Sequence, residues 1–202
     1  MNFRTELPTA ENSSNFNAVA DAATKAGTTL ENLKAAVAGE TGASAKYAAF
    51  AKAAKEQGFD QLARLWEATS AAEQIHINLE ASLVEAEDPS YTRPTAEAPT
   101  PEAIDLNLIA SANDEIFETS DMYPTFIKKA QEEGHAKAVK VFTRAKLAEA
   151  VHAEKYLEAY NNIDAADDDA YYLCPGCGYI HKGDDFEKCP ICGVPKAKFQ
   201  CF

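Results

Sequence analysis

Apolar residues recur at alternating steps of three and four along four long segments of the chain. This spacing places them on one face of an α-helix, where they form the seam that a helix buries against its neighbours. The segments are residues 29–57, the stretch from Gly58 to Glu85, residues 101–132, and the stretch from Gly134 to Tyr160. Gly58 and Gly134 each stand where one segment meets the next, and glycine favours a turn there. The pattern therefore predicts two helical hairpins packed as a four-helix bundle.

Acidic and histidine residues occupy seam positions where apolar residues belong. One helix carries the Glu-x-x-His pair Glu73 and His76, and another repeats it at Glu149 and His152, so that each pair lies on one helical face. The whole set of interrupting residues is Glu40, Glu73, His76, Glu115, Glu118, Glu149 and His152. Counted from the turn glycines, the glutamates of paired helices lie at similar heights, so these side chains are predicted to converge inside the bundle.

Burial of several carboxylates and imidazoles together is costly unless a cation compensates them. Two Glu-x-x-His helices, with a glutamate from each of two others, are typical of ferritin-like di-iron proteins. Any one of these residues alone could be an ordinary core histidine or a solvated glutamate. Because all seven fall in register on four helices, we favour a site for two metal ions.

The stretch from Glu85 to Thr100 is rich in proline and acidic residues, which makes it a poor helix. About 16 extended residues can span roughly 50 Å, enough to cross from one end of a bundle to the other. A ferritin-like topology requires one such long crossover. The alternative, a boundary between two domains, would leave each hairpin with an incomplete metal site.

Four of the five cysteines lie in two Cys-x-x-Cys pairs, each followed by a glycine. The pairs are Cys174 with Cys177 and Cys189 with Cys192. The segment around them is too short to bury a sufficient core, so a bound metal is expected to stabilise it, and four thiolates suit iron or zinc. The glycines allow tight turns that point amide N–H groups at the sulfurs. The spacing alone does not choose between the two metals.

Composition restricts the partners and the compartment. The 202 residues include 19 Lys and Arg against 32 Asp and Glu, a net charge of −13, which argues against nucleic acid and anionic membranes as partners. Neither a signal peptide nor an apolar run long enough for a membrane span is recognisable, so a cytoplasmic protein is expected. The predicted organisation is an N-terminal extension at 1–28, a bundle at 29–160, an acidic linker at 161–170 and a four-cysteine domain at 171–202.

In combination, these motifs and the run Met122-Tyr123-Pro124 after Glu115-x-x-Glu118 resemble the rubrerythrin family. The resemblance implies a ferritin-like di-iron bundle with a C-terminal rubredoxin-like domain that binds one iron. It also implies a cytoplasmic peroxidase of oxidative-stress defence, which reduces hydrogen peroxide to water. Electrons would come from NAD(P)H through rubredoxin or an NAD(P)H:rubredoxin reductase. The resemblance further implies a head-to-tail homodimer in which the four-cysteine iron of one subunit approaches the di-iron site of the other.

The resemblance also implies residue roles. Glu73 and Glu149 would bridge the two irons, Glu40 and Glu118 would be terminal carboxylates, and His152 would bind one iron. The other iron would exchange Glu115, when oxidised, for His76, when reduced. Tyr47 and Tyr123 match tyrosines that hydrogen-bond to ligands. From the helical seam alone, Tyr47 is either a proton donor near the site or a core tyrosine.

Two other functions use the same features. A ferroxidase or iron-storage protein would need the same bundle, but would have little use for an attached one-electron centre. A non-catalytic protein could carry zinc in the four-cysteine domain and use that domain to bind a partner. A red, reducible ferric-thiolate chromophore would favour electron transfer over both.

Overall fold

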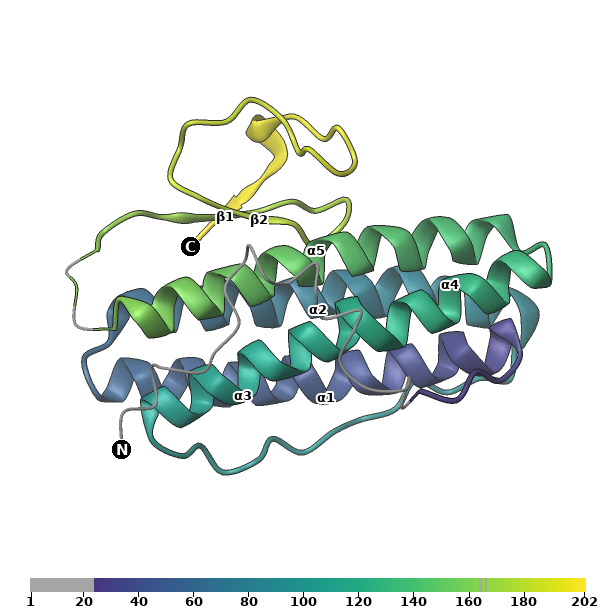
Figure 1. Ribbon diagram of the computed structural model, residues 1–202, viewed down its shortest axis with the longest axis horizontal. Helices are drawn as coiled ribbons and strands as arrows, with labels where there is room; N and C mark the ends of the chain where they lie inside the picture. The colour runs from purple at the N-terminus through teal and green to yellow at the C-terminus, as the bar shows by residue number, and fades with distance from the viewer. Residues whose placement is uncertain (1–23, 164, 166) are drawn as a thin grey trace.

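Four long helical segments lie side by side, and a small sheet docks on one side of them (Figure 1). The structure is a computed structural model that describes residues 24–163, 165 and 167–202. Most of the expected N-terminal extension therefore lies outside the described residues. The helices are α1 Thr29–Glu56, α2 Asp60–Glu87, α3 Ile104–Phe117, the π-helix η2 Glu118–Met122, α4 Tyr123–Glu132 and α5 Ala136–Asn161.

Local signals set the ends of the two hairpins. Thr28 caps α1 in a capping box with Glu31, so that both side chains satisfy backbone N–H groups at the helix start. Gly58 and Gly134 adopt positive φ angles of 80° and 69°, a conformation that favours glycine. Each glycine turns the chain directly between antiparallel helices, as the sequence predicted.

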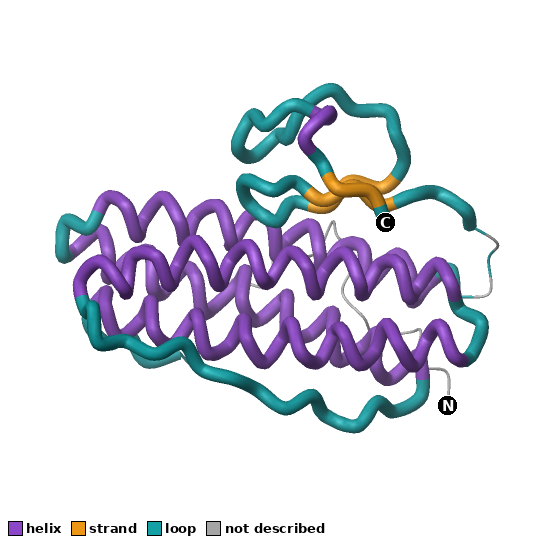
Figure 2. The backbone as a smooth tube through the Cα atoms, turned by 180° about the vertical axis from the view of Figure 1, so that it is seen from behind, coloured by secondary structure: helices purple, strands orange, loops and turns teal. Residues whose placement is uncertain are grey.

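The connection between the hairpins runs as an extended strap along the bundle, which Figure 2 shows from behind. It begins and ends slightly later than expected, because α2 continues to Glu87 and α3 starts only at Ile104. The Asn107 side chain holds the entry to α3: its Oδ1 accepts from the backbone N–H of Glu102, and its Nδ2 donates to the carbonyl of that residue, both at 3.0 Å. The strap is the single long crossover of a ferritin-like bundle.

The third bundle helix is interrupted just before Pro124. Pro124 has no N–H to donate to the preceding turn. The chain forms the π-helix η2 immediately before the proline, and α4 restarts at Tyr123. A π-turn inserts an extra residue per turn and commonly occurs at functional sites. Glu118 is the first residue of η2, so the Glu115-x-x-Glu118 motif ends where the regular helix ends.

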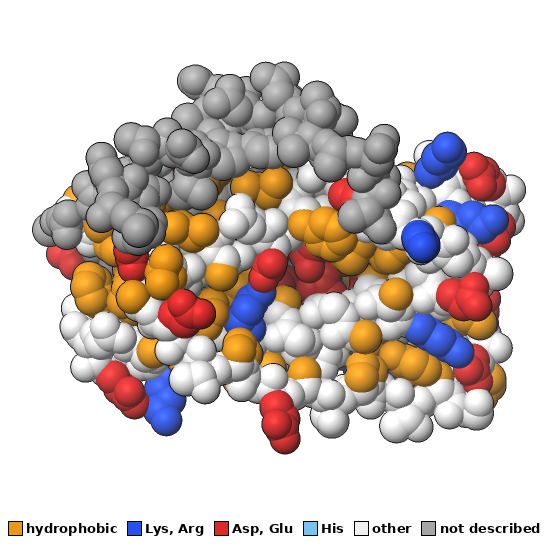
Figure 3. Space-filling view, turned by 60° about the horizontal axis from the view of Figure 1, so that its bottom comes forward, with side chains coloured by type: hydrophobic (Ala, Val, Ile, Leu, Met, Phe, Trp, Pro, Cys, Tyr) orange, Lys and Arg blue, Asp and Glu red, His pale blue; other side chains and the backbone are white. Residues whose placement is uncertain are grey.

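Two apolar clusters fill the bundle on either side of the polar level. One contains Trp66, Leu108 and Tyr156, and the other contains Leu33 and Phe142. The predicted ligands fall between these clusters along each helix. Outside the core, basic and acidic side chains are interspersed with apolar ones on the face shown in Figure 3, so that face presents no uniformly basic surface. Within the described residues, no helix combines the length and apolar character that crossing a membrane requires.

The C-terminal part is a three-stranded antiparallel sheet with strand order β2-β1-β3. Its strands are β1 Tyr171–Leu173, β2 Ile180–Lys182 and β3 Gln200–Cys201, and the short 3₁₀-helix η3 Lys196–Lys198 precedes the last strand. Tyr171, Leu173 and Ile180 join the same buried cluster as Tyr156 of α5. The sheet is therefore packed on the bundle through apolar contact.

Candidate metal centres

The bundle brings six of the seven predicted ligands together in two groups. Within each group, one ligand atom from every residue lies within 4.8 Å of the others. The first group is Glu40, Glu73, His76 and Glu149, and the second is Glu73, Glu115, Glu149 and His152. Glu73 and Glu149 belong to both groups, which is the placement that a carboxylate bridging two ions needs. The two groups together describe adjacent positions for two cations.

Glu118 lies outside both groups. It is buried at the start of η2, and burial, followed by the charges of Glu40 and Glu115, raises the pKa of its carboxyl group well above the ordinary value. The charges of these two glutamates act on it, so it lies near the cluster without belonging to either group. Its role as a terminal ligand stays a prediction.

Both histidines are oriented by the four-cysteine part of the chain. His76 Nε2 lies 3.0 Å from the carbonyl oxygen of Cys177, and His152 Nε2 lies 2.8 Å from that of Gly178. A carbonyl can only accept, so each Nε2 carries a proton, and each Nδ1 is the ring atom that faces the carboxylates. Each Nδ1 lies 2.7 Å from an oxygen of Glu149. The tautomer that the carbonyls impose is the one that can bind a cation through Nδ1.

The cluster contains buried carboxylate groups whose charge a pair of cations would neutralise. Glu40 Oε2 has no hydrogen-bond partner, and the buried oxygens of Glu73 and Glu149 have none besides the Nδ1 atoms of the two histidines. Burial raises the pKa of Glu115 to about 8. Burial acts in the same direction on Glu149, but the two imidazoles outweigh it and hold the pKa of that carboxyl group below its usual range. Such buried, unsatisfied ligand atoms fit a dinuclear metal site.

Two buried tyrosines contact the cluster. Tyr47 donates its hydroxyl hydrogen bond to Glu115, and Tyr123 donates to Glu40. Both hydroxyls lie on the inner side of the bundle among carboxylates, where burial raises their pKa values well above the ordinary one. Both tyrosines therefore remain protonated donors to ligand carboxylates.

Sequence reasoning missed one buried acid. Glu80 is fully buried in α2, and its Oε1 lies 2.9 Å from Tyr123 Oη, within hydrogen-bonding distance. It fills the seam step between His76 and Leu83, a signal that was available in the sequence. Glu80 follows His76 by four residues and so lies on the same face of the helix. It is not part of a Glu-x-x-His pair, and the search for that motif therefore did not find it.

The four cysteines of the C-terminal part form a second, separate group. Cys174 Sγ lies 3.4 Å from Cys192 Sγ, and Cys177 Sγ lies 3.5 Å from Cys189 Sγ. The Cys177 thiol, helped by a backbone N–H, lowers the pKa of Cys174 to about 5. Convergent sulfurs with backbone donors suit a tetrahedral metal ion. Cys201 is exposed on β3 and is not part of this group.

Gly178 is required where the two centres meet. Its φ angle is 77°, and a Cβ atom built on it would lie 2.3 Å from His76 Nε2. Both facts disfavour any residue with a side chain at this position. The left-handed backbone conformation is unfavourable for such residues, and the His76 imidazole already occupies the place of a Cβ atom. The expected turn at this glycine is present, and it also allows the four-cysteine loop to approach the histidines closely.

Replacement of Gly178 by alanine is therefore expected to separate the two parts of the chain. The left-handed backbone alone costs about 1–2 kcal/mol, and the clash with His76 adds to that cost. Limited proteolysis of the linker should become faster in Gly178→Ala, while both metal contents stay near those of the unmodified protein. Gly183→Ala is the matched control, because Gly183 has a φ angle of 83° but its added Cβ would approach nothing closer than 3.7 Å. Equal proteolysis of the two variants would contradict this role of Gly178.

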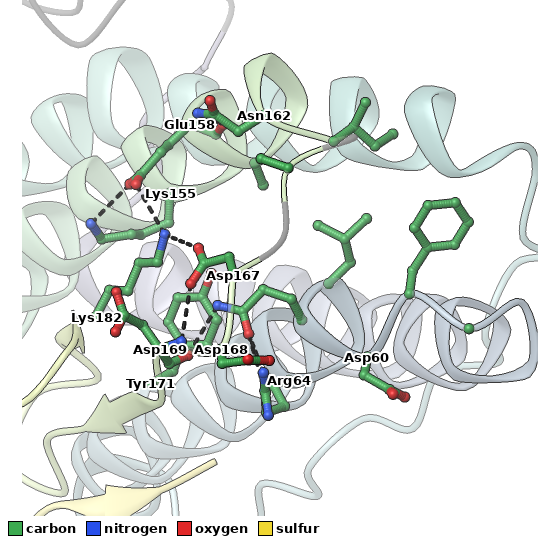
Figure 4. A pocket seen from close by; sticks show the side chains of 17 residues that line it. Asp60, Arg64, Lys155, Glu158, Asn162, Asp167, Asp168, Asp169, Tyr171 and Lys182 are labelled. Atoms are coloured by element: carbon green, nitrogen blue, oxygen red, sulfur yellow. Dashed lines mark hydrogen bonds and ion pairs between the residues drawn. The ribbon is translucent and has the colours of Figure 1, made fainter.

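A hollow of about 630 Å³ lies at the end of the bundle beside the linker (Figure 4). Its walls contain an ion-pair cluster in which Lys182 of β2 contacts both Glu158 of α5, at 3.2 Å, and Asp167 of the linker. Gln61 Nε2 of α2 also donates to the carbonyl of Asp169 at 3.0 Å. None of the predicted ligands is among its lining residues. The cluster ties the linker and the sheet to the bundle of the same chain.

Comparison with known proteins agrees with both centres. The model of the family described as rubrerythrin matches residues 31–160, and that of the rubrerythrin, rubredoxin-like domain matches residues 172–200. The chain is 66% identical over 202 residues to nigerythrin of Nitratidesulfovibrio vulgaris (strain Hildenborough), with all of both chains covered. It is 33% identical over 184 residues to rubrerythrin of the same organism, which covers 87% of this chain and 95% of that relative.

The fold agrees as well. A solved structure of nigerythrin in its fully reduced, all-ferrous state has a TM-score of 0.90 to this chain at 66% identity, and it covers all of both chains. The glutamate–histidine cluster fits the di-iron site of such proteins, and the four cysteines fit the rubredoxin-like iron site. With both of its parts matched in sequence and in fold, the chain belongs to the rubrerythrin family.

Proposed function

We propose that this protein is a non-haem di-iron peroxidase, which reduces hydrogen peroxide to water with electrons that enter through its four-cysteine iron. The observation that carries the proposal is the pair of hydrogen bonds from His76 and His152 to the carbonyls of Cys177 and Gly178. A ferroxidase or storage protein has no need to attach a one-electron centre to both histidines of its metal site.

The residues of the cluster suit this reaction. Two ferrous ions held there supply the two electrons that cleavage of an O–O bond consumes. Reduction of one hydrogen peroxide molecule to two water molecules also consumes two protons. Tyr47 and Tyr123 each hold a proton on Oη beside a ligand carboxylate. The full burial of the glutamates limits the entry of bulk water, so these two hydroxyls are the nearest groups that can orient the ligand carboxylates and relay a proton to the site.

Few covalent bonds and one hydrogen bond separate the four-cysteine site from the histidines of the bundle. It runs from Cys177 Sγ through that residue's own carbonyl, across the 3.0 Å hydrogen bond, and into the His76 ring that faces the glutamates. All of these groups belong to one chain. The resemblance implied the same approach between subunits, whereas here a single chain makes the contact. Assembly into a homodimer stays a prediction, but we expect the electrons to reach the bundle within one chain.

The electron donor and the compartment are part of the proposal. We expect reduction by NAD(P)H through rubredoxin or a rubredoxin reductase, in the cytoplasm, as part of oxidative-stress defence. The four-cysteine site suits such a donor because it is a one-electron centre on the outer side of the bundle (Figure 1). Because the net charge is −13, we expect the donor to bind through a basic surface.

A visible spectrum with a metal analysis tests the proposed function. The purified protein is expected to contain three irons per chain and to show a red ferric-thiolate chromophore. NADPH with a rubredoxin reductase should bleach the chromophore, and hydrogen peroxide should restore it with two electrons consumed per peroxide. A colourless protein with zinc on the cysteines would rule out electron entry at that site. Iron that accumulates well beyond three per chain would instead favour storage.

A further inference from the structure

The fully buried Glu80 is not used by the proposed ligand set, yet it lies next to that set. It sits one helical turn after His76 in α2, and Tyr123 Oη separates its carboxyl group from that of Glu40. Its other oxygen, Oε2, has no hydrogen-bond partner. A buried carboxyl group with one hydrogen bond that belongs to neither ligand group requires an explanation.

The hydrogen bonds can be counted. Three oxygens form a row, Glu80 Oε1, Tyr123 Oη and Glu40 Oε1, with the tyrosine oxygen within hydrogen-bonding distance of both carboxyl groups. Two hydrogen bonds need two protons, and the tyrosine hydroxyl has only one. One of the two carboxyl groups must therefore supply the second proton.

Charge decides which carboxyl group supplies it. Five buried glutamates, Glu40, Glu73, Glu115, Glu118 and Glu149, already exceed the charge of two divalent ions by one when all are ionised. A sixth buried carboxylate without a cation of its own would add a costly uncompensated charge. Glu40 lies in a ligand group and Glu80 lies in neither. The proton therefore belongs on Glu80, and burial, which raises the pKa of Glu80 to about 8, acts in the same direction.

We propose that Glu80 is a positioning residue of the di-iron site, whose protonated carboxyl group donates to Tyr123 Oη and thereby directs the tyrosine proton to Glu40. With Glu80 as the donor, Tyr123 cannot turn its own proton away from Glu40. The orientation of Glu40 is then fixed from outside the ligand set, in the way that outer hydrogen bonds orient metal ligands elsewhere. The proposal deepens the proposed function, and rests on it only for iron as the resident metal.

Zinc-loaded protein tests the proposal without any redox reaction. In that form the five ligand glutamates are ionised, so Glu80 is expected to give an infrared carbonyl band of a protonated carboxyl group. The band should vanish in Glu80→Gln and persist in Glu67→Gln, a control that changes an exposed glutamate of the same helix. Absence of the band from the unmodified zinc protein, or its persistence in Glu80→Gln, would overturn the assignment. Loss of peroxidase activity with the band intact would instead count only against the proposed function.

Zinc affinity separates positioning from packing. Glu80→Gln keeps a donor for Tyr123 and should hold zinc in competition with a chelator within about threefold of the unmodified protein, whereas Glu80→Leu should bind at least about tenfold more weakly. Because Glu80 acts through Tyr123, adding Glu80→Leu to Tyr123→Phe should cause little further loss. Additive losses in the double variant would show that Glu80 does not act through the tyrosine. Should the leucine variant fail to fold, the infrared comparison still decides.

Discussion

Metal-free protein is expected to lose stability as the pH rises from about 5 to about 9, and metal-loaded protein is expected to lose much less. Burial raises the pKa of Glu80 and of Glu115 from 4.5 to about 8, and it raises those of Glu40, Glu73 and Glu118 as well. An acid whose pKa is raised in the folded state binds a proton that the unfolded chain has released. The free energy of unfolding therefore falls as the pH rises between the two pKa values.

The other groups of the cluster do not reverse this slope. Burial lowers the pKa values of His76 and His152, but nearby glutamates outweigh it and leave them raised well above 6.5. A histidine with a raised folded pKa contributes stability that is present below the unfolded value and is lost as the pH rises through the folded one. The pKa of Glu149 is lowered, so its contribution changes only below 4.5 and is constant in this window. The combined loss is expected to reach several kcal/mol, since one unit is worth about 1.4 kcal/mol.

Urea unfolding at a series of pH values measures this effect. The midpoint of the chelated protein should decrease steadily with pH. The midpoint of the zinc-loaded protein should decrease much less, because bound cations hold the ligand carboxylates ionised in the folded state and only Glu80 keeps its proton. Glu115→Gln should flatten the slope of the chelated protein, and Glu67→Gln, on the surface of α2, should leave it unchanged. A chelated protein that becomes more stable at high pH would contradict this account.

The sequence predicted the bundle because its signals were local and repeated. Two Glu-x-x-His pairs in register, with Gly58 and Gly134 at the turns, defined the hairpins and the level at which six ligands meet. The π-helix was missed because alternating steps of three and four residues assume a regular helix, and a proline by itself indicates at most a bend. Whether a π-turn forms depends on how the surrounding helices pack against the segment, and a local sequence pattern does not contain that information.

The junction between the centres was missed for a different reason. The atoms that contact His76 and His152 are backbone carbonyls, and a carbonyl has no sequence signature. Gly178 was recognised as a turn residue beside the sulfurs, but its second purpose, the space that it leaves for an imidazole, requires knowledge of what lies opposite. The composition of the acidic linker at 161–170 gives no direction to the four-cysteine domain that follows it. In the structure, Lys182 of this domain forms ion pairs with Glu158 of α5 and with Asp167 of the linker, and these contacts hold the domain against the bundle.

Chains that each lack one centre are expected not to rescue one another. Cys174→Ser removes one thiolate of the four-cysteine site, and Glu73→Ala removes a carboxylate shared by both groups of the bundle. Cys174→Ser alone should lose nearly all NADPH-driven turnover, because electrons no longer reach the bundle. Its chemically reduced di-iron site should still be oxidised by peroxide in a single turnover, since the two sets of ligands share no residue. Loss of that single turnover as well would show that the centres are not independent.

Mixing the two variants decides which chain receives the electrons. Lys182, Asp167 and Gln61 connect the module and its linker to the α2 and α5 helices of the same chain, so the His76 contact is expected to form within that chain. In a mixed dimer, each intact module would then face a damaged bundle. Co-expressed chains with two different tags allow the mixed species to be isolated and its composition confirmed by mass. It should show no more NADPH peroxidase activity than the single variants.

The control for this experiment pairs unmodified chains with Cys174→Ser chains. That mixed species should keep about half of the activity per bundle, which shows that tagging and exchange do no damage. A dimer whose subunits exchange modules makes the same histidine contacts between chains. In that case, the mixture of Cys174→Ser and Glu73→Ala would recover one working pair of centres. Recovered activity would therefore assign the path to two subunits, whereas its absence, with exchange confirmed, assigns it to one.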